Sequence, residues 1–241
     1  MKRKILYWIQ ILIFAVPVAL IMIWFNDRKE LPETYSNYLE KEYSADNGPV
    51  CRNLGNSYFY GLDIEKNPAN AVYYFRQGAE LGDDYSQYML GICYMEGVGV
   101  KKNSEEGILW LKIASENNNV LAQSYLGQCY FHGIGLEPDL SIARNLLLKA
   151  APLENPEVEL RIAQCYHFEN EANPNFDEAV KWYRKAADKG HPEAQYSLAE
   201  LYYKGLGVSE DYAEAVRWCR KSAAQGYQDA IDTMNKLGEE I

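Results

Sequence analysis

Residues typical of catalytic and metal sites are scarce in this sequence. Its 241 residues include only three histidines and five cysteines, and no Gly-x-Ser-x-Gly, Walker or glycine-rich dinucleotide pattern occurs. Because 34 aspartates and glutamates outnumber the 24 lysines and arginines, the clustered positive charge that binds nucleic-acid phosphates is lacking. A charged content of 24% and an aromatic content of 13% exclude a disordered polar chain. We therefore expect a folded protein that is not an enzyme and has no cofactor, nucleic-acid partner or small-molecule substrate.

Metal-ligand spacing is also missing. The nearest candidate groups are Cys129 with His132 and Cys165 with His167, whose side chains face different directions on predicted helices. A zinc site needs four converging ligands, so we predict no metal site.

One hydrophobic run is long enough to cross a membrane. Residues 5–25 carry no ionisable charge apart from the neutral Tyr7, and 21 helical residues span roughly 30 Å, the thickness of a bilayer's hydrocarbon core. A cleaved signal peptide would have a shorter apolar region and a small-residue cleavage site, which this run lacks. We predict an uncleaved transmembrane helix, with a cleaved leader as the alternative.

The charges beside this run predict its orientation. Three basic residues lie in the tail 1–4, whereas the two basic residues after the run are accompanied by two acidic ones. The positive-inside bias then places the amino terminus in the cytoplasm and the rest outside it, in the periplasm if the source is bacterial. Residues 1–30 hold five basic and two acidic side chains, which leaves 19 basic and 32 acidic side chains, a net charge of −13, on residues 31–241.

A polar spacer, 26–48, follows the apolar run. It is either a tether or one short amphipathic helix built on Tyr35, Tyr38, Leu39 and Tyr43.

The remaining chain repeats itself every 36 residues. An aliphatic residue recurs at this spacing, and a tyrosine lies four positions after each of the first five: Leu54, Leu90, Leu126, Ile162, Leu198 and Met234, then Tyr58, Tyr94, Tyr130, Tyr166 and Tyr202. A glycine turn and a helix-capping Asn or Asp follow, before a second apolar stripe at helical spacing. A single hairpin buries too little to stand alone, so the units must stack into an all-α solenoid. We predict helix-turn-helix repeats over residues 49–229, in the units 50–85, 86–121, 122–157, 158–193 and 194–229, and a capping helix over 230–241.

The unit resembles a known repeat. Its pattern A-x-x-x-L-G-x-x-Y-x-x-G-x-G-V, followed by D/N, A, W, K-A-A and a final G, is similar to the Sel-one-like repeat, a 36-residue relative of the tetratricopeptide repeat. Residues 194–226 and 86–100 match best, and the resemblance covers about residues 50–241. It implies a right-handed superhelical scaffold for protein–protein contacts, used in this family by adaptors, envelope regulators, quality-control factors and immunity proteins. Unit four departs from the pattern at 169–171, where Glu-Asn-Glu replaces the glycine turn.

Equivalent positions of the 36-residue unit at which the residue type changes from one unit to the next, called columns here, predict the binding face. On the first helices they are Asn53, Asn56 and Tyr60; Met89, Ile92 and Glu96; Tyr125, Gln128 and His132; Arg161, Gln164 and Phe168; and Ser197, Glu200 and Lys204. First helices line the concave side of such solenoids. Exposed Met89, Ile92, Tyr125 and Phe168 would then anchor a protein partner in a groove, unless these positions are merely solvated.

The cysteines divide into two kinds. Cys93, Cys129 and Cys165 share one column beside the core tyrosines, where packed repeats would hold them ~10 Å apart, too far for a disulfide. We predict that they are small core residues. Cys51 occupies an otherwise polar column, so we predict that it is the most reactive thiol.

These observations predict a membrane-anchored scaffold that binds a protein outside the cytoplasm, in a single-pass protein of the inner membrane if the source is bacterial. One alternative is an immunity protein that neutralises an envelope-targeted toxin. Another is a cell-wall or β-lactam hydrolase, for which the sequence offers no nucleophile beside a base.

Overall fold

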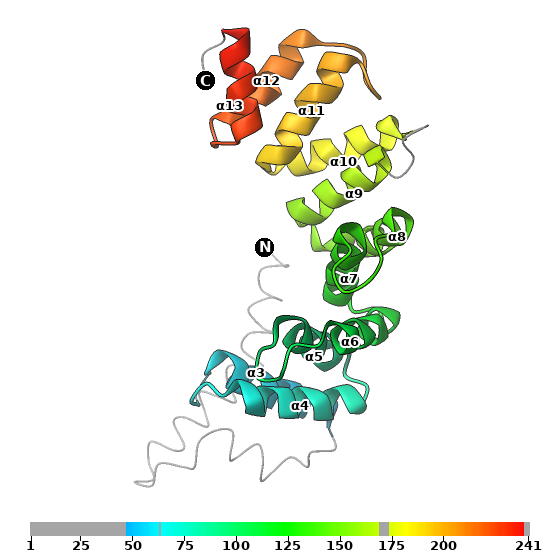
Figure 1. The fold of residues 1–241 in the computed structure, drawn as a ribbon, viewed down its shortest axis with the longest axis vertical. Coiled ribbons are helices and arrows are strands. Elements are labelled where there is room, and N and C mark those ends of the chain that lie inside the picture. The colour runs from blue at the N-terminus through cyan, green and yellow to red at the C-terminus, as the bar shows by residue number, and fades with distance from the viewer. Residues whose placement is uncertain (1–46, 63, 169–173, 239–241) are drawn as a thin grey trace, which may run out of the picture.

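Helices make up all of the regular structure in the part of the chain that the computed structural model describes, residues 47–62, 64–168 and 174–238 (Figure 1). Five antiparallel hairpins and one further helix stack into a curved rod. The helices are α3 (Gly48–Tyr60), α4 (Pro68–Glu80), α5 (Asp84–Glu96), α6 (Ser104–Glu116), α7 (Val120–His132), α8 (Leu140–Ala150), the 3₁₀ helix η1 (Ala151–Leu153), α9 (Pro156–Phe168), α10 (Phe176–Asp188), α11 (Pro192–Lys204), α12 (Tyr212–Ala223) and α13 (Gln228–Leu237).

Two local features shape the hairpins. In repeats one, two, three and five the first helix ends at a glycine in the left-handed conformation, with φ of 73°, 74°, 70° and 62° at Gly61, Gly97, Gly133 and Gly205. The second helix starts after an Asn or Asp whose side-chain oxygen accepts the backbone N–H three residues later, at 2.9–3.2 Å. The backbone N–H of that residue also donates to the repeated tyrosine's carbonyl, as Asn67 does to Tyr58. The predicted turn chemistry is confirmed.

The repeated aliphatic column forms a buried spine. Its six side chains are at most 3% exposed. Beside it, a small residue lets the two helices approach closely: a Cβ added at Gly91 would lie 2.8 Å from Leu111 Cγ. The most deeply buried partners on the second helices are Phe75, Leu111, Leu147 and Tyr183.

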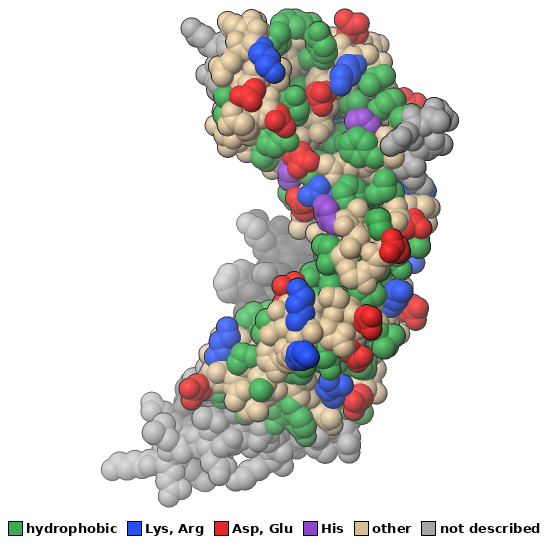
Figure 2. Space-filling model, viewed as in Figure 1, with side chains coloured by type: hydrophobic (Ala, Val, Ile, Leu, Met, Phe, Trp, Pro, Cys, Tyr) green, Lys and Arg blue, Asp and Glu red, His purple; other side chains and the backbone are tan. Residues whose placement is uncertain are grey.

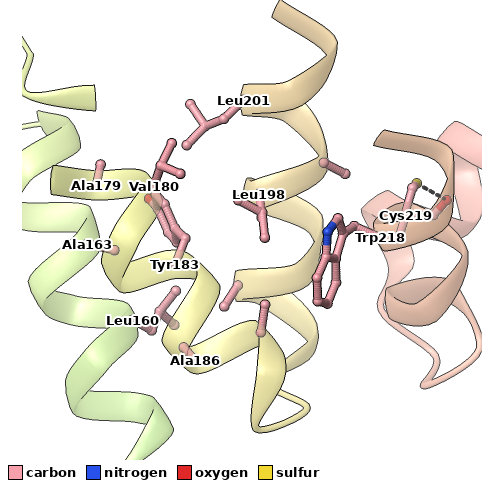
Figure 3. Close-up of a cluster of buried hydrophobic side chains, with 14 of the residues drawn as sticks. Leu160, Ala163, Ala179, Val180, Tyr183, Ala186, Leu198, Leu201, Trp218 and Cys219 are labelled. Atoms are coloured by element: carbon pink, nitrogen blue, oxygen red, sulfur yellow. Dashed lines mark hydrogen bonds between the residues drawn. The ribbon is translucent and has the colours of Figure 1, made fainter. Parts of the chain in front are cut away.

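The core is continuous from one repeat to the next. In the cluster of Figure 3, Leu160 on α9, Tyr183 on α10 and Leu198 on α11 belong to the same packed group as Trp218 on α12. Each second helix packs between two first helices, and the first helices also meet directly, α3 with α5 and α7 with α9. This places the first helices on the inner side of the curve.

Repeat three departs from the regular hairpin. Its second helix, α8, has 11 residues and is followed by η1, because Pro152 lacks the N–H needed to continue an α-helix. Glu154 then adopts a positive φ of 51°, at a column that turns the chain the same way in every repeat: Gly82, Asn118, Glu154, Gly190 and Gly226.

The predicted transmembrane run 5–25, most of the spacer and the unit-four turn lie outside the described residues. Within the described ranges, no helix is long and apolar enough to span a bilayer.

Candidate protein-binding face

The inner face contains most of the residues expected there, with two corrections. Six are exposed (Asn53, Tyr60, Glu96, His132, Phe168 and Lys204) and seven are half-buried (Asn56, Ile92, Tyr125, Gln128, Arg161, Ser197 and Glu200). The expectation for Met89 is wrong: it is 4% exposed, because its unbranched apolar side chain packs into the core between α4 and α5. Gln164 is also buried, held by hydrogen bonds on both sides of its amide.

A second set of inner-face residues was missed by sequence reasoning. It lies one helical turn earlier on the same first helices: Tyr85, Tyr88, Leu121, Glu157, Glu193 and Tyr196. These columns also change character between units, and they precede the predicted ones by the three or four residues of one helix face. That spacing was the available signal.

The inner face is aromatic in repeats one to three. The rings of Tyr85 and Tyr88 lie 6.1 Å apart, and burial, with the neighbouring Tyr60 adding to it, raises the pKa of Tyr85. The Tyr125 hydroxyl donates to Glu96 Oε1 at 2.9 Å, which ties α7 to α5. Burial, followed by the neighbouring Glu96, raises the pKa of Tyr125, so its phenol stays neutral. The surface therefore offers half-buried rings with polar hydroxyls, which is the chemistry of protein-binding anchors.

In repeats four and five the inner face is a network of charges. Arg161 pairs with Glu157 at 2.6 Å and donates to the Gln164 side chain, and Gln164 in turn donates to Glu193 at 2.7 Å. Glu157 also lies 3.1 Å from His191 Nε2. The hydrogen bond with His191 is the main reason that the pKa of Glu157 is lowered, with Arg161 adding to it against the effect of burial. The network therefore links α9 to α11 and to His191 just before it.

Positive and negative side chains are interspersed over the visible surface and do not gather into a patch of one sign (Figure 2). On the inner face, the Lys204 ammonium pairs with Glu200 at 3.3 Å.

The prediction for Cys51 is wrong, because its column is polar and yet buried. Gln87, Gln123 and Gln195 are 3–4% exposed, and each Nε2 donates at 3.1–3.2 Å to a carbonyl at the end of the preceding second helix. Cys51 takes the same place and is 1% exposed. The polar residues of this column are buried and hydrogen-bonded, and are not solvated surface side chains. Because Cys51 occupies the same buried position, its thiol is shielded from reagents.

Three of the four buried polar residues in this column, Gln87, Glu159 and Gln195, have a hydrogen-bond partner thirty positions later. Asn117 donates to Gln87 at 2.8 Å, and Lys189 donates to Glu159 at 2.7 Å. In repeat one, Leu81 stands at the partner position of Cys51, so both polar members are replaced together.

The other three column cysteines behave as predicted. Cys93, Cys129 and Cys165 are free thiols at most 1% exposed. Burial raises the pKa of Cys93 and Cys165 to about 12 and that of Cys129 to about 11.

Cation–π contacts join several of the repeated tyrosines to the preceding repeat. Arg76, Lys112 and Arg184 on the second helices lie 5.5–6.0 Å from the ring centres of Tyr94, Tyr130 and Tyr202 in the next repeat. In repeat three this position is Leu148, and Arg144, one turn earlier, takes over the contact with Tyr166 at 5.2 Å. The tyrosine column therefore joins neighbouring repeats.

The histidines serve local structure. His132 is exposed while Cys129 is buried, and His167 Nδ1 lies 3.2 Å from the Tyr183 hydroxyl. Across the described residues, no three His, Cys, Asp or Glu side chains come together as a metal site would require.

A curved stack of helical hairpins with a constant core and a varied inner face defines the class of α-solenoid repeat proteins. The model of the Sel1 repeat matches five segments that together cover most of the chain: 49–83, 84–119, 120–153, 156–191 and 192–227. The chain belongs to the Sel1 repeat family.

Solved structures share this architecture. A Sel1 repeat protein from Oxalobacter formigenes is 30% identical with a TM-score of 0.70, over 84% of this chain and 82% of that one. The protein c5321, a protective antigen of uropathogenic Escherichia coli, is 32% identical with a TM-score of 0.68 over 76% of this chain, which spans only 39% of its length. The immunity protein Pa5087 from Pseudomonas aeruginosa is 16% identical with a TM-score of 0.41, too distant to carry an argument. No curated protein matches the chain.

Proposed function

We propose that the protein is a membrane-anchored scaffold whose inner face binds a protein partner outside the cytoplasm. The observation that carries this proposal is the contrast between a core that is constant across five repeats and an inner face on which neighbouring repeats present different side chains. A solenoid that served only as a spacer would have no need of half-buried aromatic rings there.

The inner face suits a partner with apolar anchors and positive charge. Tyr60, Tyr85, Tyr88 and Tyr125 supply rings that bury large area at small entropic cost. Residues 31–241 carry a net charge of −13, which would steer a basic partner toward the face. Because hydrogen bonds and ion pairs already hold the face, little conformational entropy would be lost on binding.

The anchor rests on the 5–25 run and its flanking charges. In sealed inside-out vesicles, we expect added protease to leave the repeats intact and to digest them only after the bilayer is opened. Release of the protein by alkaline carbonate would contradict the anchor, and digestion in sealed vesicles would contradict its orientation. Neither result would bear on the proposal that the inner face binds a protein.

The binding face is tested in two steps. Crosslinking from membranes, followed by affinity purification, identifies the partner, and its affinity is then measured for Tyr125→Ala combined with Phe168→Ala. We expect a loss of at least tenfold, which corresponds to about 1.4 kcal/mol. The matched control is Tyr73→Ala, because Tyr73 is similarly exposed but lies on the second helix α4. Equal affinities for all three proteins would refute the assignment.

Nothing within the described residues favours the narrower roles, immunity against a toxin or hydrolysis, over this general one. Purification of a secreted toxin as the crosslinked partner would select the first.

A further inference from the structure

The first repeat has an open end. In each later repeat the first helix packs against the preceding second helix, as α5 does against α4. There, Val72 and Phe75 of α4 belong to the same buried cluster as Leu90 and Cys93 of α5. For α3, no element of the described chain takes the place of that preceding helix. Solenoids need a capping element at such an end, because its face would otherwise expose the spine.

The sequence before α3 continues the 36-residue period. Leu39 lies one period before Phe75, in the column of the most buried second-helix residues, and Tyr38 lies one period before Tyr74, in a mostly aromatic column. Pro32 likewise precedes Pro68, the first residue of α4.

The connection into α3 is also in phase. Asp46 lies one period before Gly82, at the column where the described repeats all have positive φ, and Asp is among the residues that tolerate this conformation. Asn47 lies one period before the helix cap Asp83, and both residues have an extended backbone, with ψ of 108° and 109°, although only Asp83 caps its helix through its side chain. The segment thus has the spacing of a second helix followed by the usual turn.

We propose that residues 32–45 form a half-repeat, a second helix that docks on the open face of α3 and caps the solenoid. This goes beyond the proposed function and does not depend on it. It replaces the view of the spacer as a tether.

Size changes at the junction support the docking. In the described repeats a small residue, such as Ala79, lies against the buried amide of Gln87, whose Nε2 donates to its carbonyl at 3.2 Å. One period earlier, Tyr43 stands in the column of Ala79, and Cys51 stands in the column of Gln87. A large ring therefore replaces a methyl group, and a small thiol replaces a long amide. The two changes compensate in volume, as contacting residues in a packed core must.

A docked cap also limits how far the solenoid extends from the apolar run. Only residues 26–31 would remain between that run and the cap, a reach of at most ~20 Å. The repeats would then lie close to any membrane anchor, with no long flexible linker between them.

The test uses the full chain in mild detergent and compares Leu39→Asp with Asn37→Asp. Both changes add one negative charge, but residue 37 falls in the exposed column of Tyr73, Leu109 and Lys181. We expect Leu39→Asp to speed hydrogen exchange of the α3 amides at least tenfold and leave α11 unchanged, while Asn37→Asp stays within twofold of wild type.

Alkylation of Cys51 gives a second readout. Tyr43→Ala removes only the ring proposed to cover Cys51, and we expect its native-state iodoacetamide labelling to rise at least fivefold while Cys93, Cys129 and Cys165 stay unlabelled. Unchanged Cys51 labelling and α3 exchange in both variants would overturn the proposal. So would equal effects of the residue 37 and residue 39 changes, or labelling of all cysteines alike, since a docked cap protects α3 alone.

Discussion

The ion pair between α9 and the end of α10 shows how strongly a single junction holds the repeats. Glu159 accepts a hydrogen bond from Lys189 Nζ at 2.7 Å, and the side chains are 6% and 36% exposed. The other carboxylate oxygen, Glu159 Oε2, is buried without a hydrogen-bond partner. Repeat two holds a neutral amide pair, Gln87 with Asn117, in the same place.

We predict that Glu159→Ala lowers the free energy of unfolding by about 2–4 kcal/mol. Breaking a fully buried ion pair costs about 3–5 kcal/mol, and we reduce this because the half-exposed Lys189 regains water. The double change Glu159→Gln with Lys189→Asn recreates the amide pair of repeat two. It removes both the buried charge and the unpartnered oxygen, so we expect a stability within about 1 kcal/mol of wild type, or above it.

The assay is equilibrium urea unfolding followed by circular dichroism, with hydrogen exchange to locate the change in α9 and α10. Lys181→Ala is the matched control, because Lys181 and Glu178 form an exposed pair in α10 at 2.6 Å, and an exposed pair contributes little to stability. The reasoning is refuted if Glu159→Ala costs no more than this control, or if the double variant loses more than about 2 kcal/mol.

Three further outcomes test the spine, the inner network and the thiols. Leu126→Ala truncates a buried spine residue and should cost about 2–5 kcal/mol in urea unfolding; a cost near zero would place Leu126 outside the core. Since the pKa of Glu157 is lowered in the folded state, its stabilising contribution is present above its ordinary pKa and is lost as pH falls through the folded value. Wild type should therefore lose more stability than Glu157→Gln as pH falls below about 4.5, and parallel curves would contradict the network. With its pKa near 11, Cys129 should resist iodoacetamide at pH 8 until the chain unfolds, since the thiolate is the reactive form; rapid native labelling would contradict its burial.

The two halves of the inner face differ in how they meet a partner. Repeats one to three expose rings around Tyr85 and Tyr88, whereas in repeats four and five Arg161 and Glu157 already satisfy each other. A partner gains more by covering rings than by competing with an existing ion pair. We therefore expect the strongest contributions to binding from the amino-terminal half.

The repeat architecture was predictable because each column reports the same environment five times. Leu90 and Tyr94 alone would leave the helix assignment ambiguous, but their recurrence identifies a spine, and Gly97 with Asn103 locates the turn. Met89 was misplaced because an apolar residue in a varied column fits either a groove or a core. Only packing against α4 decides between them.

The sequence by itself determined the period, the hairpin turns, the spine and the class of solenoid. Backbone conformation and helix periodicity are local properties, and a residue such as Gly61 or Asn67 specifies them through its own chemistry. Tertiary structure alone decided that Cys51 and Gln87 are buried, that Arg144 replaces the missing cation at Leu148, and that Glu157 and Arg161 form one network with His191. These outcomes depend on which side chains from neighbouring repeats meet in space, and such contacts join residues from 22 positions apart, as in Arg144 and Tyr166, to 34 positions apart, as in Glu157 and His191.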